Sequence, residues 1–245
     1  MDDAVLTLDI DWAPDCAIDW IARTLVARQV RATWFITHHT AAVERLRERP
    51  DLFQLGIHPN FLAGSSHGDT TDAVLDHCMR LVPEASTLRS HALVQSTPIL
   101  ARVMSQTPVI TDLSLYLPYT PHLRPVEYRI GGRALLRLPY FWEDDDEMQQ
   151  PEPSWRLGPL LQIGPGLKVF DFHPIHVYMN AADMTPYRRL TARVPRLQDA
   201  VESDLDGLVR TGEGTRSLFL ELVEHLSTRG SLRVCDVAAG CAQPA

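Results

Sequence analysis

Residues 6–12 read LTLDIDW and place two carboxylates, Asp9 and Asp11, at the end of a short apolar run. Residues 4–10 are rich in valine, leucine, threonine and isoleucine, which favours a buried β-strand over a helix of that length. Because successive strand residues point to opposite faces, Asp9 and Asp11 are expected to face the same side. One could then bind a cation while the other takes a proton; the alternative is that both cap the next helix or are solvated.

Predicted strands and helices alternate after this stretch. Such alternation is typical of an α/β fold in which parallel strands are wrapped by helices. We expect strands at residues 4–10, 32–37, 52–57, 87–88, 109–113 and 168–173, and helices at residues 15–30, 42–49, 71–81 and 98–104.

The later part of the chain interrupts and then closes this pattern. Residues 127–130 and 133–138 are separated by two glycines that tolerate positive φ, which predicts an inserted β-hairpin. Residues 197–209 and 216–228 have the apolar spacing of amphipathic helices, which we expect to pack outside the sheet.

Length and composition are those of a soluble globular protein. The chain has 245 residues, of which 45% are hydrophobic and 22% charged. We interpret residues 1–237 as a single domain and residues 238–245 as a flexible tail. The four cysteines form no C-x-x-C pair, which argues against a zinc ribbon or a disulfide scaffold.

Charge and hydropathy exclude several kinds of partner. The formal net charge of -8 and the scattered arginines argue against nucleic-acid binding. The N-terminus does not resemble a signal peptide and no run of 18 apolar residues occurs, so we expect a cytoplasmic protein without membrane insertion. The sequence gives no indication of the oligomeric state.

Histidines follow several of the predicted strands. His38 and His39 follow the second strand, His58 the third, and His173 and His176 the last. The carboxyl ends of the strands are where α/β barrels build their sites. Imidazole together with carboxylate suits zinc and similar ions, so the sequence predicts a metal site at this edge.

Five segments resemble, in order, the first motif, the strand that follows it, and three later motifs of the polysaccharide deacetylases of carbohydrate esterase family 4. They are LTLDIDW at residues 6–12, ATWFIT at 32–37, GIH at 56–58, LRSH at 88–91 and VFDFHP at 169–174. More narrowly, HPNF at 58–61 and HPIH at 173–176 resemble deacetylases of bacterial O-antigen and other surface-polysaccharide biosynthesis clusters. The resemblance implies a distorted (β/α) barrel with about seven parallel strands, into which the hairpin is inserted.

The same resemblance implies a divalent metal, with zinc as the expected ion. Its ligands would be Asp11, His58 and His67. The family usually places its two metal histidines four residues apart, but Leu62 occupies the second position here. His67 is reached by a loop containing glycine and serine, and His91 is the competing third ligand.

The resemblance also assigns catalytic roles. Asp9 would be the general base, Arg89 would orient it, and His173 would be the general acid. His176 or Asp171 would hold the imidazole of His173 in its useful tautomer. Asp171 stands where the family has the leucine of its acyl pocket, so the acyl group is open. The residues expected to bind substrate are His91, His176, Trp12 and Asp171.

The acidic segment at residues 143–147 is interpreted as a solvated loop. Trp142 and Asp144 nevertheless resemble the fourth motif of the family.

These features together predict a metal-dependent hydrolase that removes an N-acetyl or other acyl group from an amino sugar. The sugar would belong to a surface polysaccharide or to a nucleotide-linked or lipid-linked precursor. Two alternatives are an amidohydrolase acting on a non-sugar amide, such as a cyclic ureide, and a noncatalytic sugar-binding barrel. A serine hydrolase is excluded because the chain lacks G-x-S-x-G.

Overall fold

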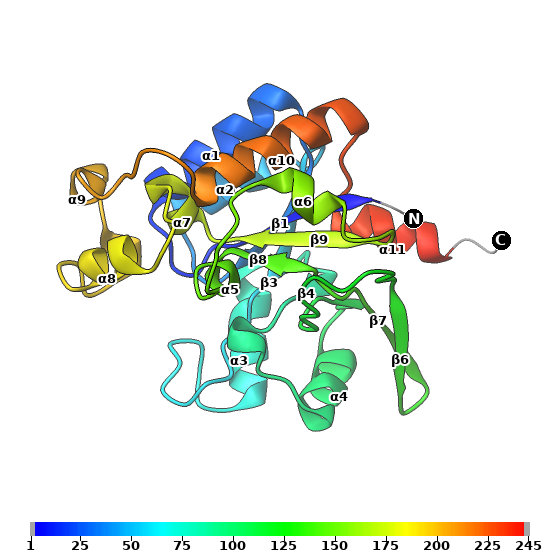
Figure 1. The fold of residues 1–245 in the computed structure, drawn as a ribbon. Helices are drawn as coiled ribbons and strands as arrows, with labels where there is room; N and C mark the ends of the chain where they lie inside the picture. The colour runs from blue at the N-terminus through cyan, green and yellow to red at the C-terminus, as the bar shows by residue number, and fades with distance from the viewer. Residues whose placement is uncertain (1–2, 243–245) are drawn as a thin grey trace.

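The computed structural model describes residues 3–242, which form a curled sheet wrapped by helices (Figure 1). The nine strands lie in the order β6-β7-β5-β4-β3-β2-β1-β9-β8, so β6 and β8 form the two edges. Their bounds are β1 Ala4–Asp9, β2 Ala32–Ile36, β3 Phe53–Ile57, β4 Thr87–Leu88, β5 Thr111–Asp112, β6 Val126–Ile130, β7 Arg133–Arg137, β8 Trp142–Glu143 and β9 Lys168–Phe172.

The sheet is parallel apart from the predicted hairpin. β6 runs antiparallel to β7, and every other pair of neighbouring strands is parallel. Eight of the nine strands run parallel, because only β6 is antiparallel, and about seven parallel strands were expected. The two-residue strand β8 was not predicted. At the hairpin turn Gly131 and Gly132 have φ of 56° and 80°, as a tight turn of this kind requires. The predicted α/β fold, a distorted (β/α) barrel with an inserted hairpin, is confirmed, and its curled sheet forms a half-barrel.

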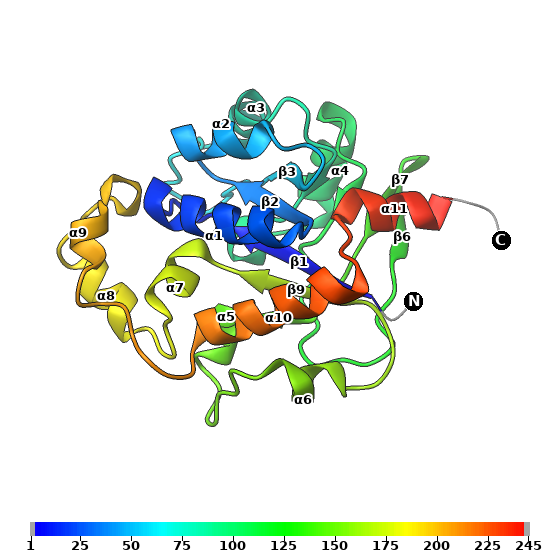
Figure 2. The same ribbon diagram turned by 90° about the horizontal axis from the view of Figure 1, so that it is seen from above.

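Helices cover the outer face of the sheet. α1 and α10 lie side by side over β1 and β9 (Figures 1 and 2). The α-helices are α1 Asp15–Arg28, α2 Ala41–Arg47, α3 Thr71–Leu81, α4 Thr97–Gln106, α5 Asp144–Glu147, α6 Leu157–Leu161, α7 Pro174–Met179, α8 Thr185–Thr191, α9 Glu202–Leu205, α10 Thr215–Arg229 and α11 Val234–Ala242. Two 3₁₀ turns, η1 and η2, span His91–Leu93 and Leu197–Asp199.

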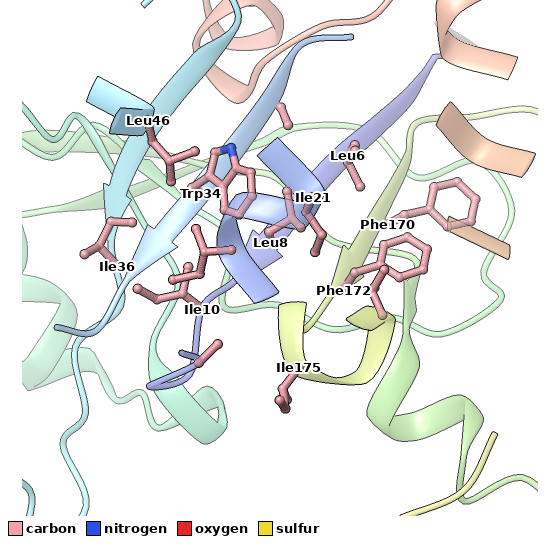
Figure 3. Packing of buried hydrophobic residues seen from close by; sticks show 14 of the residues in the cluster. Leu6, Leu8, Ile10, Ile21, Trp34, Ile36, Leu46, Phe170, Phe172 and Ile175 are labelled. Atoms are coloured by element: carbon pink, nitrogen blue, oxygen red, sulfur yellow. The ribbon is translucent and has the colours of Figure 1, made fainter. Parts of the chain in front are cut away.

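Alternation along β1 separates the hydrophobic core from the site. Leu6 and Leu8 are fully buried in the cluster that also contains Ile21 of α1 (Figure 3). Burying each such side chain contributes about 1.5–3 kcal/mol to folding. The intervening residues, Thr7 and Asp9, face the inside of the curled sheet. The outer face therefore packs in the larger hydrophobic cluster, and the inner face carries the polar groups together with a smaller hydrophobic cluster that contains Val5, Phe35 and Val169.

The last helix closes the amino end of the half-barrel. Val234 and Val237 of α11 are buried in the inner cluster, and the Val234 N–H donates to Thr33 Oγ1 at 3.0 Å. Residues 238–242, expected to be a tail, therefore continue a docked helix; residues 243–245 lie outside the described residues. The prediction failed because the small residues after Val237 show no apolar stripe.

The prediction of a single helix at residues 197–209 is wrong. The chain forms η2, becomes extended at Ala200 and Val201, and forms only the short helix α9. The Val201 N–H donates to Asp204 Oδ2 at 2.9 Å, so the Asp204 side chain caps the first turn of α9. The chain therefore begins a new helix here and does not extend η2. The helix predicted at residues 216–228 is present as α10.

None of the helices within residues 3–242 is both long and apolar enough to cross a bilayer.

Candidate active site

The turn after β1 brings Asp11 into the site. Asp11 and Trp12 have φ of 36° and 55°, in the left-handed region that residues other than glycine rarely occupy. The Trp12 N–H donates to Thr37 Oγ1 at 3.0 Å, which holds this turn. β1 ends at Asp9, so Asp11 reaches the site through the turn and not through the strand alternation that we expected. Such backbone strain persists where the surrounding structure fixes it.

Asp11, His58 and His91 form a compact cluster at the carboxyl ends of β1, β3 and β4. His58 Nε2 lies 3.1 Å from Asp11 Oδ1, and His91 Nδ1 lies 3.3 Å from Asp11 Oδ1. The two imidazole nitrogens are 3.3 Å apart. A tetrahedral zinc ion with bonds of about 2.0–2.1 Å has ligand atoms about 3.3 Å apart. The three atoms are therefore spaced as three corners of such a site.

Asp11 and His91 shift each other's pKa. Burial lowers the pKa of His91, but its contact with Asp11 raises it above the usual value. Burial would raise the pKa of Asp11, but His58 and His91 hold it well below its usual value, so the carboxylate is ionised. Asp11 Oδ1 is buried and has no well-aligned hydrogen-bond donor among residues 3–242, despite the nearby nitrogens. An uncommitted oxygen beside two imidazoles fits a divalent cation.

His67, the expected third ligand, is not brought into this cluster. Its Nε2 lies 2.8 Å from the Thr37 carbonyl oxygen, and its Nδ1 accepts from the Asn60 N–H at 3.1 Å. Both ring nitrogens therefore bind the backbone, and the side chain ties the loop after β3 to the end of β2. The competing candidate, His91, occupies the third position.

Arg89 lies at the end of β4 and links the inner-face polar groups of β1 and β9. Its Nη1 donates to Asp9 Oδ1 at 2.8 Å and also contacts Asp171 Oδ1, while Nη2 donates to Thr7 Oγ1 at 2.8 Å. Thr7 and Asp171 are register partners on the adjacent strands β1 and β9. The contact with Asp9 is the one on which the predicted role of Arg89, orienting Asp9, depends.

Two aromatic rings enclose the Arg89 guanidinium. Its Cζ lies 4.7 Å from the centre of the Phe35 ring and 4.5 Å from that of Tyr140. Burial opposes the charge, but Asp171 and Asp9 raise the pKa of Arg89, so it stays protonated. Tyr140 donates to Glu143 Oε2 at 2.7 Å. The cation is thus fixed in place before any substrate binds.

His58 lies near one carboxylate oxygen of Asp11, and His173 lies near the other. Its Nδ1 is 2.7 Å from Asp144 Oδ1, and its backbone N–H donates to Asp144 Oδ2 at 2.9 Å. The other ring nitrogen, Nε2, lies 3.6 Å from Asp11 Oδ2. Burial opposes protonation, but Asp145 and Asp144 raise the pKa of His173 well above its usual value. The ring is therefore an imidazolium with Nε2 directed at the cluster.

The acidic segment is not a solvated loop. Asp144 is completely buried as the partner of His173, and Glu147 is 3% exposed and accepts from Trp142 Nε1 at 2.7 Å. The sequence assigned the orientation of His173 to His176 or Asp171, whereas the structure gives it to Asp144. His176 instead binds Asp145 Oδ1 at 2.9 Å. The resemblance of Trp142 and Asp144 to a family motif was the signal that could have identified this pair.

A cavity of about 260 Å³ opens onto these groups. It is lined by Asp9, Asp11, His58, Ser90, His91, Ala92, Leu93, Tyr140, Glu143, Asp145 and His173. Of the four residues expected to bind substrate, His91 lines this cavity. Trp12 packs against His91 with ring centres 5.3 Å apart, Asp171 lies behind Arg89, and His176 lies behind Asp145.

Comparison with known families identifies the family of this chain. The model of the WbmS-like polysaccharide deacetylase family matches residues 6–191, which include every residue of the cluster described above. The chain belongs to the WbmS-like polysaccharide deacetylases. The family membership predicted from the sequence motifs is confirmed.

A WbmS-like protein of solved structure is also similar. It comes from Bordetella bronchiseptica and is described as a polysaccharide deacetylase involved in O-antigen biosynthesis. It shares 34% sequence identity with a TM-score of 0.80, over 91% of this chain and 90% of the other. A similarity of this extent supports the half-barrel fold.

More distant matches include two enzymes of carbohydrate esterase family 4. One is the Xyl-CE4 domain of a xylanase from the hindgut metagenome of Trinervitermes trinervoides, with 10% identity and a TM-score of 0.49 over 98% of this chain and 91% of that one. The other is an acetyl xylan esterase from Clostridium thermocellum, with 11% identity and a TM-score of 0.48 over 98% and 92%. Likeness at this level does not by itself establish a shared activity. No match was found among the curated proteins.

Proposed function

We propose that this WbmS-like chain is a metal-dependent N-deacetylase acting on an acylated amino sugar of a bacterial surface polysaccharide or its precursor. One observation carries the proposal. Asp9 Oδ2 lies 3.6 Å from His58 Nδ1, and His173 Nε2 lies 3.6 Å from Asp11 Oδ2, so a buried carboxylate and a buried imidazolium both adjoin the cluster of Asp11, His58 and His91. A base and an acid beside a metal site are what metal-assisted hydrolysis of an amide requires.

The proposed cation site consists of Asp11 Oδ1, His58 Nε2 and His91 Nδ1, with zinc as the expected ion. His91 replaces His67 in this set because both ring nitrogens of His67 bind the backbone. When bound, the cation supplies Lewis acidity, which favours ionisation of water at neutral pH and stabilises negative charge on the acyl oxygen.

Asp9 is the proposed general base. Arg89 binds its Oδ1, while Oδ2 lies 3.6 Å from His58 Nδ1 on the side of the cluster. Oδ2 is therefore the oxygen that takes a proton from the attacking water. The water oxygen bonds to the amide carbon as the carbonyl π electrons move to the acyl oxygen.

His173 is the proposed general acid. Asp144 holds Nδ1, so the proton on Nε2 is the one available to the nitrogen of the tetrahedral intermediate. When the carbon–nitrogen bond breaks, its electron pair stays on nitrogen, and the proton from His173 makes it an amine. The products are the free amino sugar and a carboxylate.

The O-antigen assignment of the substrate is supported by the similar Bordetella protein and by the HPNF and HPIH segments. The amidohydrolase alternative would use the same base, acid and cation, and the noncatalytic alternative would use none of them. We favour catalysis because a sugar-binding barrel has no need for a buried carboxylate and imidazolium around one cavity.

Acetate release from N-acetylated amino sugars, by wild type and Asp9→Asn with and without chelator, tests this proposal. We expect release by wild type, loss with chelator, and a decrease of roughly 10²–10⁴-fold in Asp9→Asn. Hydrolysis of a cyclic ureide without acetate release would favour the amidohydrolase. Sugar binding by a protein that releases no acyl group would favour the noncatalytic barrel.

A further inference from the structure

Strand β6 is an open edge of the sheet. It spans Val126–Ile130 and pairs with a neighbouring strand, β7, on one side only. The hairpin projects from the body of the molecule, away from the helices α1 and α10 (Figure 1). The other edge, β8, has only two residues, and its Trp142 is completely buried. Because an exposed edge strand presents unpaired N–H and C=O groups, β6 is the edge that can accept a further strand.

The hairpin determines which backbone groups of β6 point outward. Its two-residue turn makes the flanking residues, Ile130 and Arg133, a hydrogen-bonded pair, and such pairs alternate along antiparallel strands. Every second residue of β6, beginning with Ile130, therefore directs its N–H and C=O toward β7. The backbone groups of Glu127 and Arg129 point away from the sheet, and within residues 3–242 they make no other backbone hydrogen bond.

The side chains of β6 are arranged symmetrically about Tyr128. Its two neighbours, Glu127 and Arg129, have opposite charges, share one face of the strand and form an exposed ion pair. The next residues outward, Val126 and Ile130, are both aliphatic and share the other face with Tyr128. Val126 is 50% exposed, so this apolar face is only partly covered within one chain. The strand is therefore complementary to a copy of itself that runs in the opposite direction.

We propose that β6 pairs antiparallel with β6 of a second copy of this chain, about a two-fold axis at Tyr128. In this register Glu127 lies opposite the partner's Arg129, and the two residues exchange the backbone hydrogen bonds that point outward in each chain. The axis repeats this pair on the other side of Tyr128, as in any isologous interface. On the opposite face the two Tyr128 side chains are adjacent, and Val126 lies opposite the partner's Ile130.

Charge and backbone geometry both select this register. Sliding one strand by two residues would place Glu127 opposite the partner's Glu127, or Arg129 opposite the partner's Arg129, and like charges in these positions are destabilising. Sliding it by one residue would place the outward groups of one strand opposite groups that already bind β7. Pro125 has no N–H, so the ladder ends just before Val126. The strand thus specifies one pairing and disfavours its neighbours.

The size of the interface indicates a reversible dimer. Two strands of five residues bury less than the roughly 1,200 Å² that stable complexes bury. We therefore expect a dissociation constant on the order of 10–100 μM.

Sedimentation velocity of the full chain at about 10–300 μM tests the dimer. The wild type is expected to shift from 27.6 kDa toward twice that mass as its concentration rises. Glu127→Arg and Arg129→Glu each place like charges opposite each other, so each should weaken self-association at least roughly tenfold. When mixed, the two variants are complementary, because one has two cations where the other has two carboxylates. The mixture should therefore form a heterodimer.

Two further variants separate strand pairing from general effects of charge. Arg129→Pro removes an N–H that points away from β7, so it should abolish the dimer while the hairpin is kept. Glu213→Arg breaks an exposed ion pair with Arg156 outside the sheet. It is the matched control for charge reversal and should leave the dimer unchanged.

A wild type that stays monomeric at about 300 μM overturns the proposal. So does a dimer that survives Arg129→Pro and both charge reversals, since it must then use another surface. If Arg129→Pro does not fold, as judged by circular dichroism, the mixture of Glu127→Arg and Arg129→Glu decides, and its failure to associate rejects the pairing. None of these measurements depends on acetate release, so the dimer and the proposed deacetylase function are tested separately.

Discussion

Arg89 Nη1 donates to Asp9 Oδ1 at 2.8 Å, joining the carboxyl ends of β4 and β1 inside the sheet. Both side chains are buried, and the same guanidinium also serves Asp171. Burial and the nearby Asp9 raise the pKa of Asp171 well above its usual value, although Arg89 lowers it, so the two carboxyl groups share this one cation. The position of the proposed base and the stability of the half-barrel are therefore linked through Arg89.

Replacing Arg89 by methionine should destabilise the fold. Removing one partner of a buried ion pair typically costs about 3–5 kcal/mol, because the other charge stays buried. Denaturant unfolding of Arg89→Met should show a loss of that size, together with loss of acetate release. Arg102→Met, at an exposed arginine of α4, should cost less than about 1 kcal/mol. Equal stability of the two variants would contradict the proposed linkage.

The third metal ligand can be identified by comparing two histidine variants. His91→Ala removes a nitrogen 3.3 Å from both Asp11 and His58 and should weaken zinc binding by at least about 100-fold, since it removes a direct ligand. His67→Ala removes two backbone contacts and should lower stability while the zinc stoichiometry is kept. Calorimetric titration of each metal-free protein with zinc measures this. The reverse ranking would restore His67 as the ligand.

Asp144→Asn tests whether the buried carboxylate holds His173 in its acidic form. The amide keeps the shape of the side chain but removes the charge 2.7 Å from His173 Nδ1. We expect kcat to fall roughly 10²–10⁴-fold, the range for loss of a positioned general acid, with KM little changed. Asp206→Asn at an exposed position is the control. A KM effect without a kcat effect would place Asp144 in substrate binding instead.

Glu143 should make stability depend on pH. Burial raises the pKa of its folded carboxyl from 4.5 to about 7, so folding favours the protonated form. The folded state then holds a proton that the unfolded chain has released, and its stability falls as pH rises between these values. Glu143→Gln removes this dependence and keeps an acceptor for Tyr140.

Measured on metal-free protein, the unfolding free energy of Glu143→Gln relative to wild type should increase by about 1–3 kcal/mol between pH 5 and pH 8. Glu127→Gln on the exposed edge strand β6 is the matched control. A difference between variant and wild type that is the same at both pH values would show that Glu143 is already ionised in the folded protein.

The sequence predicted the parts of the site that follow well-formed strands. Asp9 ends a strand of six residues, and His58 and His173 each follow a strand of five. Parallel strands bring their carboxyl ends to one edge. Asp144 follows β8, which has only two residues and shows no pattern. The contact between Asp144 and His173 could therefore not be predicted from the strand pattern, and the segment was interpreted only as acidic.

The remaining errors concern choices that depend on contacts distant in sequence. The choice between His67 and His91 depends on a hydrogen bond from His67 to Thr37, 30 residues away. Asp11 reaches the cluster through a left-handed turn held by the same threonine. Neither contact has a local signature, so strand periodicity gave the correct region but not the detailed geometry.

The most direct test of the metal-dependent mechanism is elemental analysis of wild type and His58→Ala, paired with acetate release from an acetamido sugar. His122→Ala, at an exposed loop histidine, is the control. The account predicts close to one zinc or similar ion per wild-type and His122→Ala chain, and loss of both metal and acetate release in His58→Ala. Acetate release by a metal-free wild type, or by His58→Ala at the wild-type rate, would contradict it.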